Sequence, residues 1–263
     1  LTKKLAKKLI YDIDDMVFLN NVSEANKIVL PLKGKKKIIK LMIYADHVIT
    51  TTPTLGRFIR KYNKNITLIP STVDTEKYKI KQDYTLHHPP VIGWSGSHST
   101  SKYLKILEPV FENLYNRNID FKVLVIGDED FNFSNSKIPL TKVAWDINTE
   151  ISYLYQIDIG LHPLIDERWI YGKLGAKTLI YMSIGIPTIA SANGNNFYII
   201  SDAENGFLVP INDLDLWERR IMQLLSDNEL REKIGKKGRE TVEAYYSLEA
   251  NKNKYLSILE SMI

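Results

Sequence analysis

The stretch His162–Pro187, HPLIDERWIYGKLGAKTLIYMSIGIP, decides how the rest of the chain is interpreted. It follows an apolar run at residues 157–161 that is typical of a buried strand. Its second half has the apolar spacing of a helix face and stops at Gly185 and Pro187, two residues that commonly end helices. That face comprises Leu174, Leu179, Ile180 and Met182. The stretch therefore predicts a strand, a turn and a helix in succession.

Two lysines and two glycines lie at the start of this predicted helix. Lys173 and Lys177 are four residues apart, so on a helix they would share one face. Gly172 and Gly175 flank Lys173 and would let a ligand approach the backbone closely. A helix N-terminus with two ammonium groups suits an anion such as a diphosphate. An ordinary strand–loop–helix unit with solvated lysines explains the same residues.

The composition is that of an ordinary globular protein. At 263 residues the chain has room for one large or two modest domains, and with 44% hydrophobic and 25% charged residues it can bury a core. Cysteine is absent, which excludes disulfides, thiolate metal sites and a cysteine nucleophile. This agrees with a cytoplasmic protein, which is the location we expect.

Positive charge is concentrated at the beginning of the chain. Residues 1–40 hold ten lysines and four acids, an excess of six, whereas the net charge of the whole chain is +4. The lysines of the densest runs are Lys3, Lys4, Lys7, Lys8, Lys33, Lys35, Lys36, Lys37 and Lys40. Such runs bind anionic lipid headgroups or nucleic acid, or they form a solvated face. We expect peripheral contact with the inner face of an anionic membrane and no nucleic-acid partner.

The sequence predicts no segment that spans a membrane. No apolar stretch approaches the roughly twenty residues that cross a bilayer. The lysine-rich start is not followed by the apolar core of a signal peptide. The first residue is Leu1 rather than Met, which suggests a fragment of a longer protein.

Strand and helix patterns alternate up to about Tyr78, as in a parallel α/β sheet. Strands are predicted at residues 8–18, 47–51 and 66–69, and helices at residues 36–45 and from Pro53 onward. Thr52 and Pro53 together form a helix start, an N-cap followed by proline. Asp12, Asp14 and Asp15 follow the first strand, where such residues cap a turn or hold a divalent cation. Without a second acidic cluster we expect no metal site.

A polar segment at residues 79–90, KIKQDYTLHHPP, ends in two prolines and is predicted to be a linker. His87 and His88 form no metal-ligand pattern and are expected to be exposed. We therefore divide the chain into domains at residues 1–82 and 83–246 and a last helix at 247–263.

The part after this linker predicts a second, fuller α/β unit. Strands are expected at residues 91–94, 121–126, 140–145, 157–161, 188–190 and 207–209, and helices at 102–115, 174–184, 214–225, 230–245 and 248–263. Ligands of such sheets bind at the carboxyl ends of the strands, near the switch in strand order. Trp94–Thr100, Gly127, Trp145 and the stretch His162–Pro187 would share that edge.

The turn GSHST at Gly96–Thr100 is a second candidate phosphate site. The N–H groups of Gly96 and Ser97 and the hydroxyls of Ser97, Ser99 and Thr100 would surround the anion. An ordinary turn of small residues explains the same sequence. It is neither a Walker loop nor a dinucleotide fingerprint, because the required lysine and glycine spacings are missing.

Patterns of hydrolytic enzymes are absent from the sequence. There is no His-Glu-x-x-His, no Gly-x-Ser-x-Gly and no plausible Ser/His/Asp set. His98 and His162 lie at predicted strand ends, where each either bonds a ligand or has a structural role.

Several separated segments resemble one family. They are WSGSHSTSKYL at 94–104, DIGLHPLIDERWIYGKLGAKTLIYMSIGIPTIAS at 158–191, ENGFLV at 204–209 and GRETVEAYYSLE at 238–249. These segments resemble bacterial glycosyltransferases of the GT-B fold, family 4 (glycosyl transferases group 1). YDIDD, ADHVITTT and VDTEKY, which begin at Tyr11, Ala45 and Val73, resemble the latter half of the first domain of that family. The resemblance implies an α/β fold with two Rossmann-like domains. The N-terminal domain would be partial and lack most of the acceptor site, and the last helix would pack back toward it.

The resemblance implies transfer of a sugar from a UDP- or GDP-linked donor to a glycan or lipid-linked acceptor in surface polysaccharide synthesis. The anomeric configuration would be retained, without metal or other cofactor. Lys173 would face the donor diphosphate and act in catalysis, with Lys177 as a weaker second candidate. Gly96, Ser97 and Thr100 would contact the diphosphate, and Gly127, Asp128 and Trp145 would lie near the nucleoside. Asp166, Glu167 and Asn195 would bond the sugar, and Asp166 is also a catalytic candidate. Preorganised cations would lower the barrier because negative charge grows on the leaving diphosphate.

The chain departs from the family pattern at two positions. Many members carry two glutamates in this stretch, the second of which binds the ribose hydroxyls; here Gly172 and Ile180 occupy those places. Neither side chain accepts a hydrogen bond, so we expect no ribose recognition by that route.

Two alternatives to an active glycosyltransferase follow from the same resemblance. One is a non-catalytic nucleotide-sugar-binding remnant or partner subunit. The other is a GT-B nucleotide-sugar 2-epimerase, which would require acid/base carboxylates and a histidine in the cleft.

Overall fold

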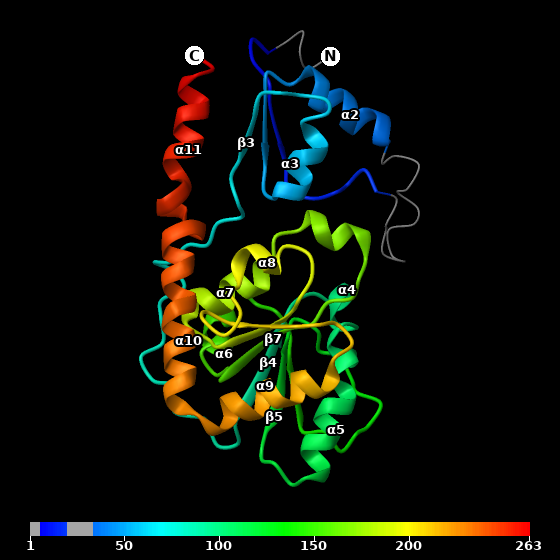
Figure 1. The fold of residues 1–263 in the computed structure, drawn as a ribbon, viewed down its shortest axis with the longest axis vertical. Coiled ribbons are helices and arrows are strands. Elements are labelled where there is room, and N and C mark those ends of the chain that lie inside the picture. Colours follow the sequence, from blue (N-terminus) through cyan, green and yellow to red (C-terminus); the bar gives the residue numbers. More distant parts are fainter. Residues whose placement is uncertain (1–5, 20–33) are drawn as a thin grey trace. The chain divides into compact units, whose positions relative to one another are not determined.

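The computed structural model describes residues 6–19 and 34–263, and these form two units (Figure 1). Unit 1 consists of three chain segments and unit 2 of two. The bounds are Leu1–Thr72, Glu167–Leu174 and Leu248–Ile263 for unit 1, and Val73–Asp166 and Gly175–Ser247 for unit 2. The sequence placed the first boundary at residues 82/83 and gave the segment Glu167–Leu174 to the second domain. In the structure this segment belongs to unit 1.

Unit 1 is built on a three-stranded parallel sheet in the order β1-β2-β3. Its strands are β1 (Ile10–Ile13), β2 (His47–Thr50) and β3 (Ile66–Leu68), and its helices are α2 (Lys35–Tyr44), α3 (Pro53–Ile59) and α11 (Leu248–Glu260). Helix α3 begins as predicted, because the Thr52 hydroxyl accepts a hydrogen bond from Leu55 N at 3.1 Å. In α11, Ile258 packs with Ile49 and Ile69.

Unit 2 is built on a six-stranded parallel sheet in the order β6-β5-β4-β7-β8-β9. Its strands are β4 (Val91–Ser95), β5 (Lys122–Ile126), β6 (Leu140–Val143), β7 (Ile159–His162), β8 (Thr188–Ser191) and β9 (Phe207–Val209). From β4 the chain adds strands outward to β6, then returns and continues from β7 on the other side of β4. The strand order therefore switches between β4 and β7, as in doubly wound sheets.

Helices cover both faces of this sheet. Those of unit 2 are α4 (His98–Ser101), α5 (Glu108–Asn116), α6 (Glu150–Leu154), α7 (Ala176–Ile184), α8 (Asn196–Ile199), α9 (Leu214–Ser226) and α10 (Asn228–Thr241). Successive residues of β4 face opposite sides: Ile92 packs with α5 and α9, and Val91 packs with α6 and α7. Two hydrophobic cores thus enclose the sheet and fix the positions of the loops at its edges.

The helix predicted at residues 102–115 is divided in the structure. Helix α4 and a 3₁₀ turn at Leu104–Leu107 precede α5, which has Pro109 in its first turn. Proline has no N–H group to continue a helix from the preceding turn, so a new helix begins there. The predicted inward residues Phe111 and Leu114 are nevertheless fully buried.

The segment at residues 79–90 has no regular secondary structure, but it is anchored to unit 2 and is not a free linker. Tyr84 is buried, and its carbonyl accepts a hydrogen bond of 3.0 Å from Arg231 Nε. His87 and His88 are exposed, as predicted. The Nδ1 atom of His87 lies 2.9 Å from the buried carboxylate of Asp158, an anchor that the sequence did not reveal.

Candidate functional site

The candidate site of unit 2 lies at the carboxyl ends of β4 and β7, where the strand order switches. In open α/β sheets this switch leaves a crevice between the loops that follow the two strands, and ligands bind there. The loop after β4 begins at Gly96, and the loop after β7 begins at Pro163. Helix α7 follows the second loop and brings Lys177 to this edge.

Lys177 is held against the loop that follows β4. Its ammonium group lies 4.9 Å from the centroid of the Trp94 ring and 3.4 Å from Thr100 Oγ1. A Cβ atom at Gly96 would stand 2.7 Å from the Lys177 Nζ atom, closer than real Cβ contacts. Glycine at position 96 therefore makes room for this half-buried cation.

Three hydroxyl groups lie beside Lys177. Ser97 Oγ is 3.0 Å from Ser99 Oγ, and Thr100 Oγ1 donates to the Ser97 carbonyl at 3.0 Å. The Gly96 N–H group donates to Ile126 O at 2.9 Å, so the prediction that this amide meets a phosphate was wrong. The donors predicted here thus reduce to the Ser97 amide, the Ser97 and Ser99 hydroxyls and the Lys177 ammonium group, because the Thr100 hydroxyl already donates to the Ser97 carbonyl.

The loop after β5 touches the loop after β4. Gly127 has a φ of +100°, and a Cβ atom there would collide with the carbonyl oxygen of Gly96. The Cβ of Trp145 lies 3.6 Å from the same position, and Trp145 is 56% exposed. The structure therefore brings together Gly96, Gly127 and Trp145, as the sequence predicted for one edge.

Asp128 is engaged inside the protein. Its carboxylate is buried and lies 3.2 Å from His98 Nδ1. Burial raises the pKa of Asp128, but hydrogen bonds from Ser101 and His98 outweigh burial, so the pKa is below its usual value. Asp128 and His98 thus tie α4 to the end of β5.

His162, at the end of β7, belongs to a buried chain of polar groups. Its Nδ1 atom lies 2.8 Å from Thr178 Oγ1, and the Thr178 hydroxyl donates to Asn196 Oδ1 at 3.3 Å. Asn196 Nδ2 in turn donates to the Ser191 carbonyl at 2.9 Å. Burial, together with the charge on Lys177, lowers the pKa of His162 to about 3. Of the two roles considered for His162, the structural one matches this environment.

The loops after β7 and β8 are joined by side-chain hydrogen bonds. Ser191 Oγ accepts from Leu164 N at 2.8 Å, and Asn193 Nδ2 donates to Ile165 O at 2.9 Å. Asn195, a predicted sugar contact, is buried in the second of these loops. Asn193 and Asn196 were not predicted from the sequence, although a run of amide side chains directly after a buried strand marks them.

Lys173 does not share a helix face with Lys177, and that prediction was wrong. Helix α7 begins at Ala176, and Lys173 has an extended backbone with φ −94° and ψ 131°. Lys173 belongs to unit 1, where its Nζ atom lies 3.3 Å from Asp15 Oδ2 and 4.9 Å from the centroid of the Trp169 ring. Its predicted role at the diphosphate is untested by this placement.

The other predicted residues of this segment lie close in sequence but in different units. Glu167 belongs to unit 1 and accepts a hydrogen bond from the indole N–H of Trp169, whereas Asp166 ends a segment of unit 2 and is exposed. A Cβ atom at Gly172 would stand 2.5 Å from Met16 Cγ. Ile180 packs against the core of unit 2. Gly172 and Ile180 occupy the two positions expected for the family glutamates, and neither has a side-chain oxygen atom.

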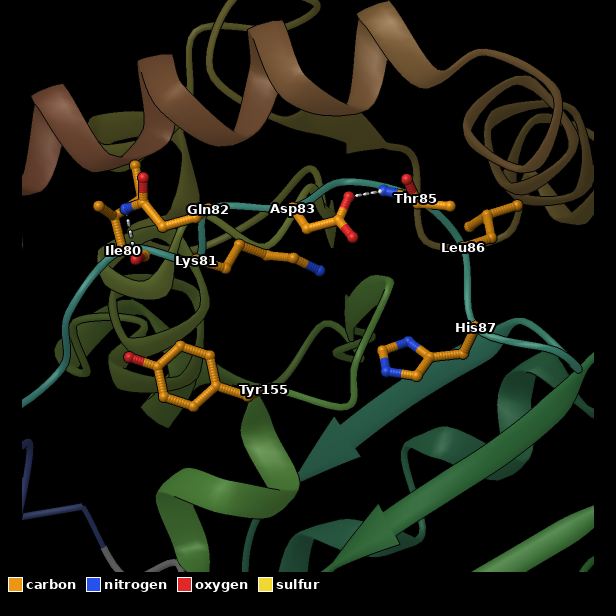
Figure 2. A pocket seen from close by; sticks show the side chains of 8 residues that line it. All are labelled: Ile80, Lys81, Gln82, Asp83, Thr85, Leu86, His87 and Tyr155. Carbon is orange, nitrogen blue, oxygen red and sulfur yellow. Dashed lines mark hydrogen bonds between the residues drawn. The ribbon is translucent and has the colours of Figure 1, made fainter.

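A hollow of about 510 Å³ in unit 2 lies apart from this edge (Figure 2). It is lined by Ile80, Lys81, Gln82, Asp83, Thr85, Leu86, His87 and Tyr155. Figure 2 shows the side chains of Lys81, Asp83 and His87 directed toward the same space. Lys81 Nζ lies 3.4 Å from Ile157 O, just before β7 begins, so the hollow is at the amino ends of the strands. Burial lowers the pKa of Lys81, against the opposing effect of Asp158.

The described residues show neither a metal-binding cluster nor a helix that could span a membrane. Within residues 6–19 and 34–263, no three histidine, aspartate or glutamate side chains are arranged to hold a metal ion. No helix in the same part of the chain combines the length and the apolar character needed to cross a bilayer.

Comparison with known proteins identifies the family. Residues 76–241 match the family model described as "Glycosyl transferases group 1", and the chain belongs to this family. The resemblance seen in the sequence is thereby confirmed.

Two curated proteins illustrate the relationship. The chain is 33% identical over 88 residues to the lipopolysaccharide core biosynthesis glycosyltransferase LpsE of Rhizobium meliloti (strain 1021), covering 34% of this chain and 26% of that protein. It is 25% identical over 186 residues to the capsular polysaccharide biosynthesis glycosyltransferase CapM of Staphylococcus aureus, covering 66% and 47%. The chain thus matches about half of these relatives or less.

A solved structure supports the fold. The Anabaena protein Alr3699/HepE, in a crystal structure with UDP-glucose, superposes with a TM-score of 0.70 at 15% identity, covering 97% of this chain and 72% of that one. The predicted α/β fold of GT-B type with parallel sheets is therefore confirmed.

Proposed function

We propose that this chain takes part in glycosyl transfer from a nucleotide-sugar donor, and that unit 2 binds the donor at the carboxyl ends of β4 and β7. The observation that carries the proposal is the position of Lys177 against Gly96, where the strand order switches. Family membership supports the proposed reaction class, and the placement of Lys177 supports the proposed donor contact.

The chemistry of this edge suits a diphosphate. Lys177 offers a cation, and Ser97 and Ser99 offer hydroxyl groups within one short turn, whereas the Thr100 hydroxyl donates to the Ser97 carbonyl. Negative charge increases on the diphosphate as the bond to the sugar breaks, and a cation fixed beforehand stabilises that charge. Trp145, exposed beside Gly127, offers a ring face on which a nucleobase can stack.

The remaining roles are proposed from the family resemblance. Lys173 is a second cation for the diphosphate and, with Asp166, a candidate for the catalytic step. Glu167 and Asn195 are candidates for the sugar hydroxyls, and Asp128 for the nucleoside. The donor is UDP- or GDP-linked, the anomeric configuration is retained, and no metal ion takes part.

The acceptor is proposed to be a glycan or a lipid-linked glycan. LpsE and CapM are named for lipopolysaccharide core and capsular polysaccharide biosynthesis, so surface polysaccharide synthesis is the process that we propose for this chain. We place this reaction at the cytoplasmic face of the membrane.

Calorimetric titration of the chain with UDP, GDP, UDP-glucose and GDP-mannose tests the proposal. We expect saturable binding of one nucleotide diphosphate and its sugar, in preference to the other base. UMP should bind at least about tenfold more weakly than UDP if UDP is the nucleotide bound, because it lacks the second phosphate. Failure of all four nucleotides to bind would contradict the proposal.

The same preparation separates the alternatives once donor binding is seen. Transfer to a glycan acceptor, with the product configuration read by NMR, supports a retaining transferase. Binding without transfer in the presence of varied acceptors would favour the non-catalytic role. Conversion of the donor to its 2-epimer would favour the epimerase.

A further inference from the structure

Helix α2 (Lys35–Tyr44) carries positive charge in its first turn, where positive charge destabilises a helix most. Lys35, Lys36 and Lys37 form its first turn, and the helix contains no acidic residue. The N-terminal end of a helix is the positive end of its dipole and favours anions. Gly34, at the N-cap, supplies no side-chain hydrogen bond. The three lysines and the glycine N-cap therefore destabilise the helix. Residues that destabilise their own secondary structure in this way often serve in binding rather than in folding.

The lysines of α2 are not explained by internal ion pairs. Lys35, Lys36, Lys37 and Lys40 are exposed, and none forms an ion pair or a ring contact with another residue that the structure describes. Lys36 and Lys40 are also four residues apart, so their like charges face each other on the helix surface. Of the other lysines in the basic runs, Lys3, Lys4 and Lys33 lie outside the described residues.

Apolar side chains lie among these lysines. Ile43 is 51% exposed and Tyr44 is 56% exposed. With Lys36 and Lys40 they follow the spacing i, i+4, i+7, i+8 that places residues on one face of a helix. Met42, on the opposite side, is fully buried in the core of unit 1. The outward face of α2 therefore combines two cations, a β-branched apolar side chain and an aromatic ring.

We propose that this face, defined by Lys36, Lys40, Ile43 and Tyr44, binds the surface of an anionic lipid bilayer. Lysines approach the headgroup phosphates, while the isoleucine and the tyrosine ring enter the boundary between headgroups and acyl chains. Tyrosine is enriched at this boundary because its ring is apolar and its hydroxyl remains hydrated.

Two other occupants fit the face less well. A nucleic acid would be attracted to the lysines, but its phosphate backbone gives no reason to expose Ile43. A second copy of the chain related by a two-fold axis would set the same lysines against each other. The membrane proposal concerns unit 1 alone and does not depend on donor binding by unit 2.

Sedimentation with lipid vesicles tests the proposal, using the full chain. Vesicles of phosphatidylcholine with about one-third phosphatidylglycerol should bind the protein at low salt, and pure phosphatidylcholine should not. The double variant Lys36→Glu/Lys40→Glu should bind at least about tenfold more weakly, because each lysine near an anionic surface adds to the attraction. Ile43→Ser should weaken binding about fivefold, because a half-exposed isoleucine loses its apolar contact with the lipid.

Lys252→Glu/Lys254→Glu is the matched control, because it makes the same charge change at two exposed lysines of α11, which packs on the opposite face of the unit 1 sheet from α2. It should retain most of the binding, and circular dichroism should show that all variants are folded. An equal loss in both double variants, or equal binding to neutral vesicles, would overturn the proposal. So would self-association of the chain that is abolished by Ile43→Ser, measured by sedimentation velocity, in the absence of vesicle binding.

Discussion

At the scale of single residues, Lys177 and His162 show how neighbouring groups divide their roles. Burial and the charge on Lys177 both disfavour a proton on His162, so the imidazole is neutral and bonded to Thr178. Lys177 is half-buried beside Trp94 and keeps its ammonium group at the edge of the sheet. One residue supports the loop structure, and the other is the cation that we propose for the donor.

The neutral state of His162 predicts a pH dependence of stability. The pKa of His162 is about 3 in the folded chain and 6.5 in the unfolded chain. Between these values the unfolded chain binds a proton that the folded chain does not, so the free energy of unfolding falls as the pH falls. The contribution of His162 is up to about 1.4 kcal/mol per pH unit.

Urea unfolding at about pH 6.5 and pH 5 measures this dependence. In His162→Gln the stability should change less between the two conditions, because glutamine does not titrate. His88→Gln, at an exposed histidine, should behave as the unmodified chain does. If His162→Gln and the unmodified chain lose the same stability on acidification, His162 is not held neutral in the fold.

At the scale of elements, the candidate site depends on loops that approach each other closely. The loops after β4 and β5 meet where Gly127 lies against the Gly96 carbonyl. The loops after β7 and β8 are joined through Ser191 and Asn193. The parallel sheet sets the spacing of the strand ends, and glycine and short polar residues let the backbones come together there.

Gly127→Ala should therefore destabilise the fold. Alanine would be strained at a φ of +100°, and its Cβ would collide with a backbone oxygen that cannot move away as a side chain can. We expect a loss of about 2 kcal/mol or more in the free energy of unfolding, measured by urea titration.

Gly56→Ala is the matched control for this substitution. Gly56 lies in α3, and a Cβ atom there would make only ordinary contacts, the nearest at 3.7 Å. This variant should be as stable as the unmodified chain or more stable by up to about 1 kcal/mol. Destabilisation of the same size in both variants would show that backbone conformation and collision are not the cause at Gly127.

The elements also show what a single sequence can and cannot predict. Strands such as β2 and β5 follow from β-branched apolar runs, and the start of α3 follows from Thr52 and Pro53, because these signals are local. The sequence did not reveal that Lys173 lies outside α7 or that the Gly96 amide is already bonded to Ile126. Both depend on which distant backbone group comes near, and sequence spacing does not contain that information.

At the scale of the whole molecule, the family match and the candidate donor site fall mainly on unit 2. The matched residues 76–241 lie within its outer bounds, except for the segment Glu167–Leu174, which belongs to unit 1. The acceptor role is therefore proposed from the family, whereas the donor role is proposed from residues that unit 2 itself brings together. Unit 1 contributes the basic face of α2, proposed to bind lipid.

The most direct test of donor binding by unit 2 is calorimetric titration of Lys177→Gln with the nucleotide that binds the unmodified chain. Glutamine keeps the length of a polar side chain but removes the cation, so the Kd should rise about tenfold or more. Lys122→Gln, at the amino end of β5 on the opposite edge, should leave the Kd unchanged. An unchanged Kd in Lys177→Gln would contradict the assignment of the donor diphosphate to this edge.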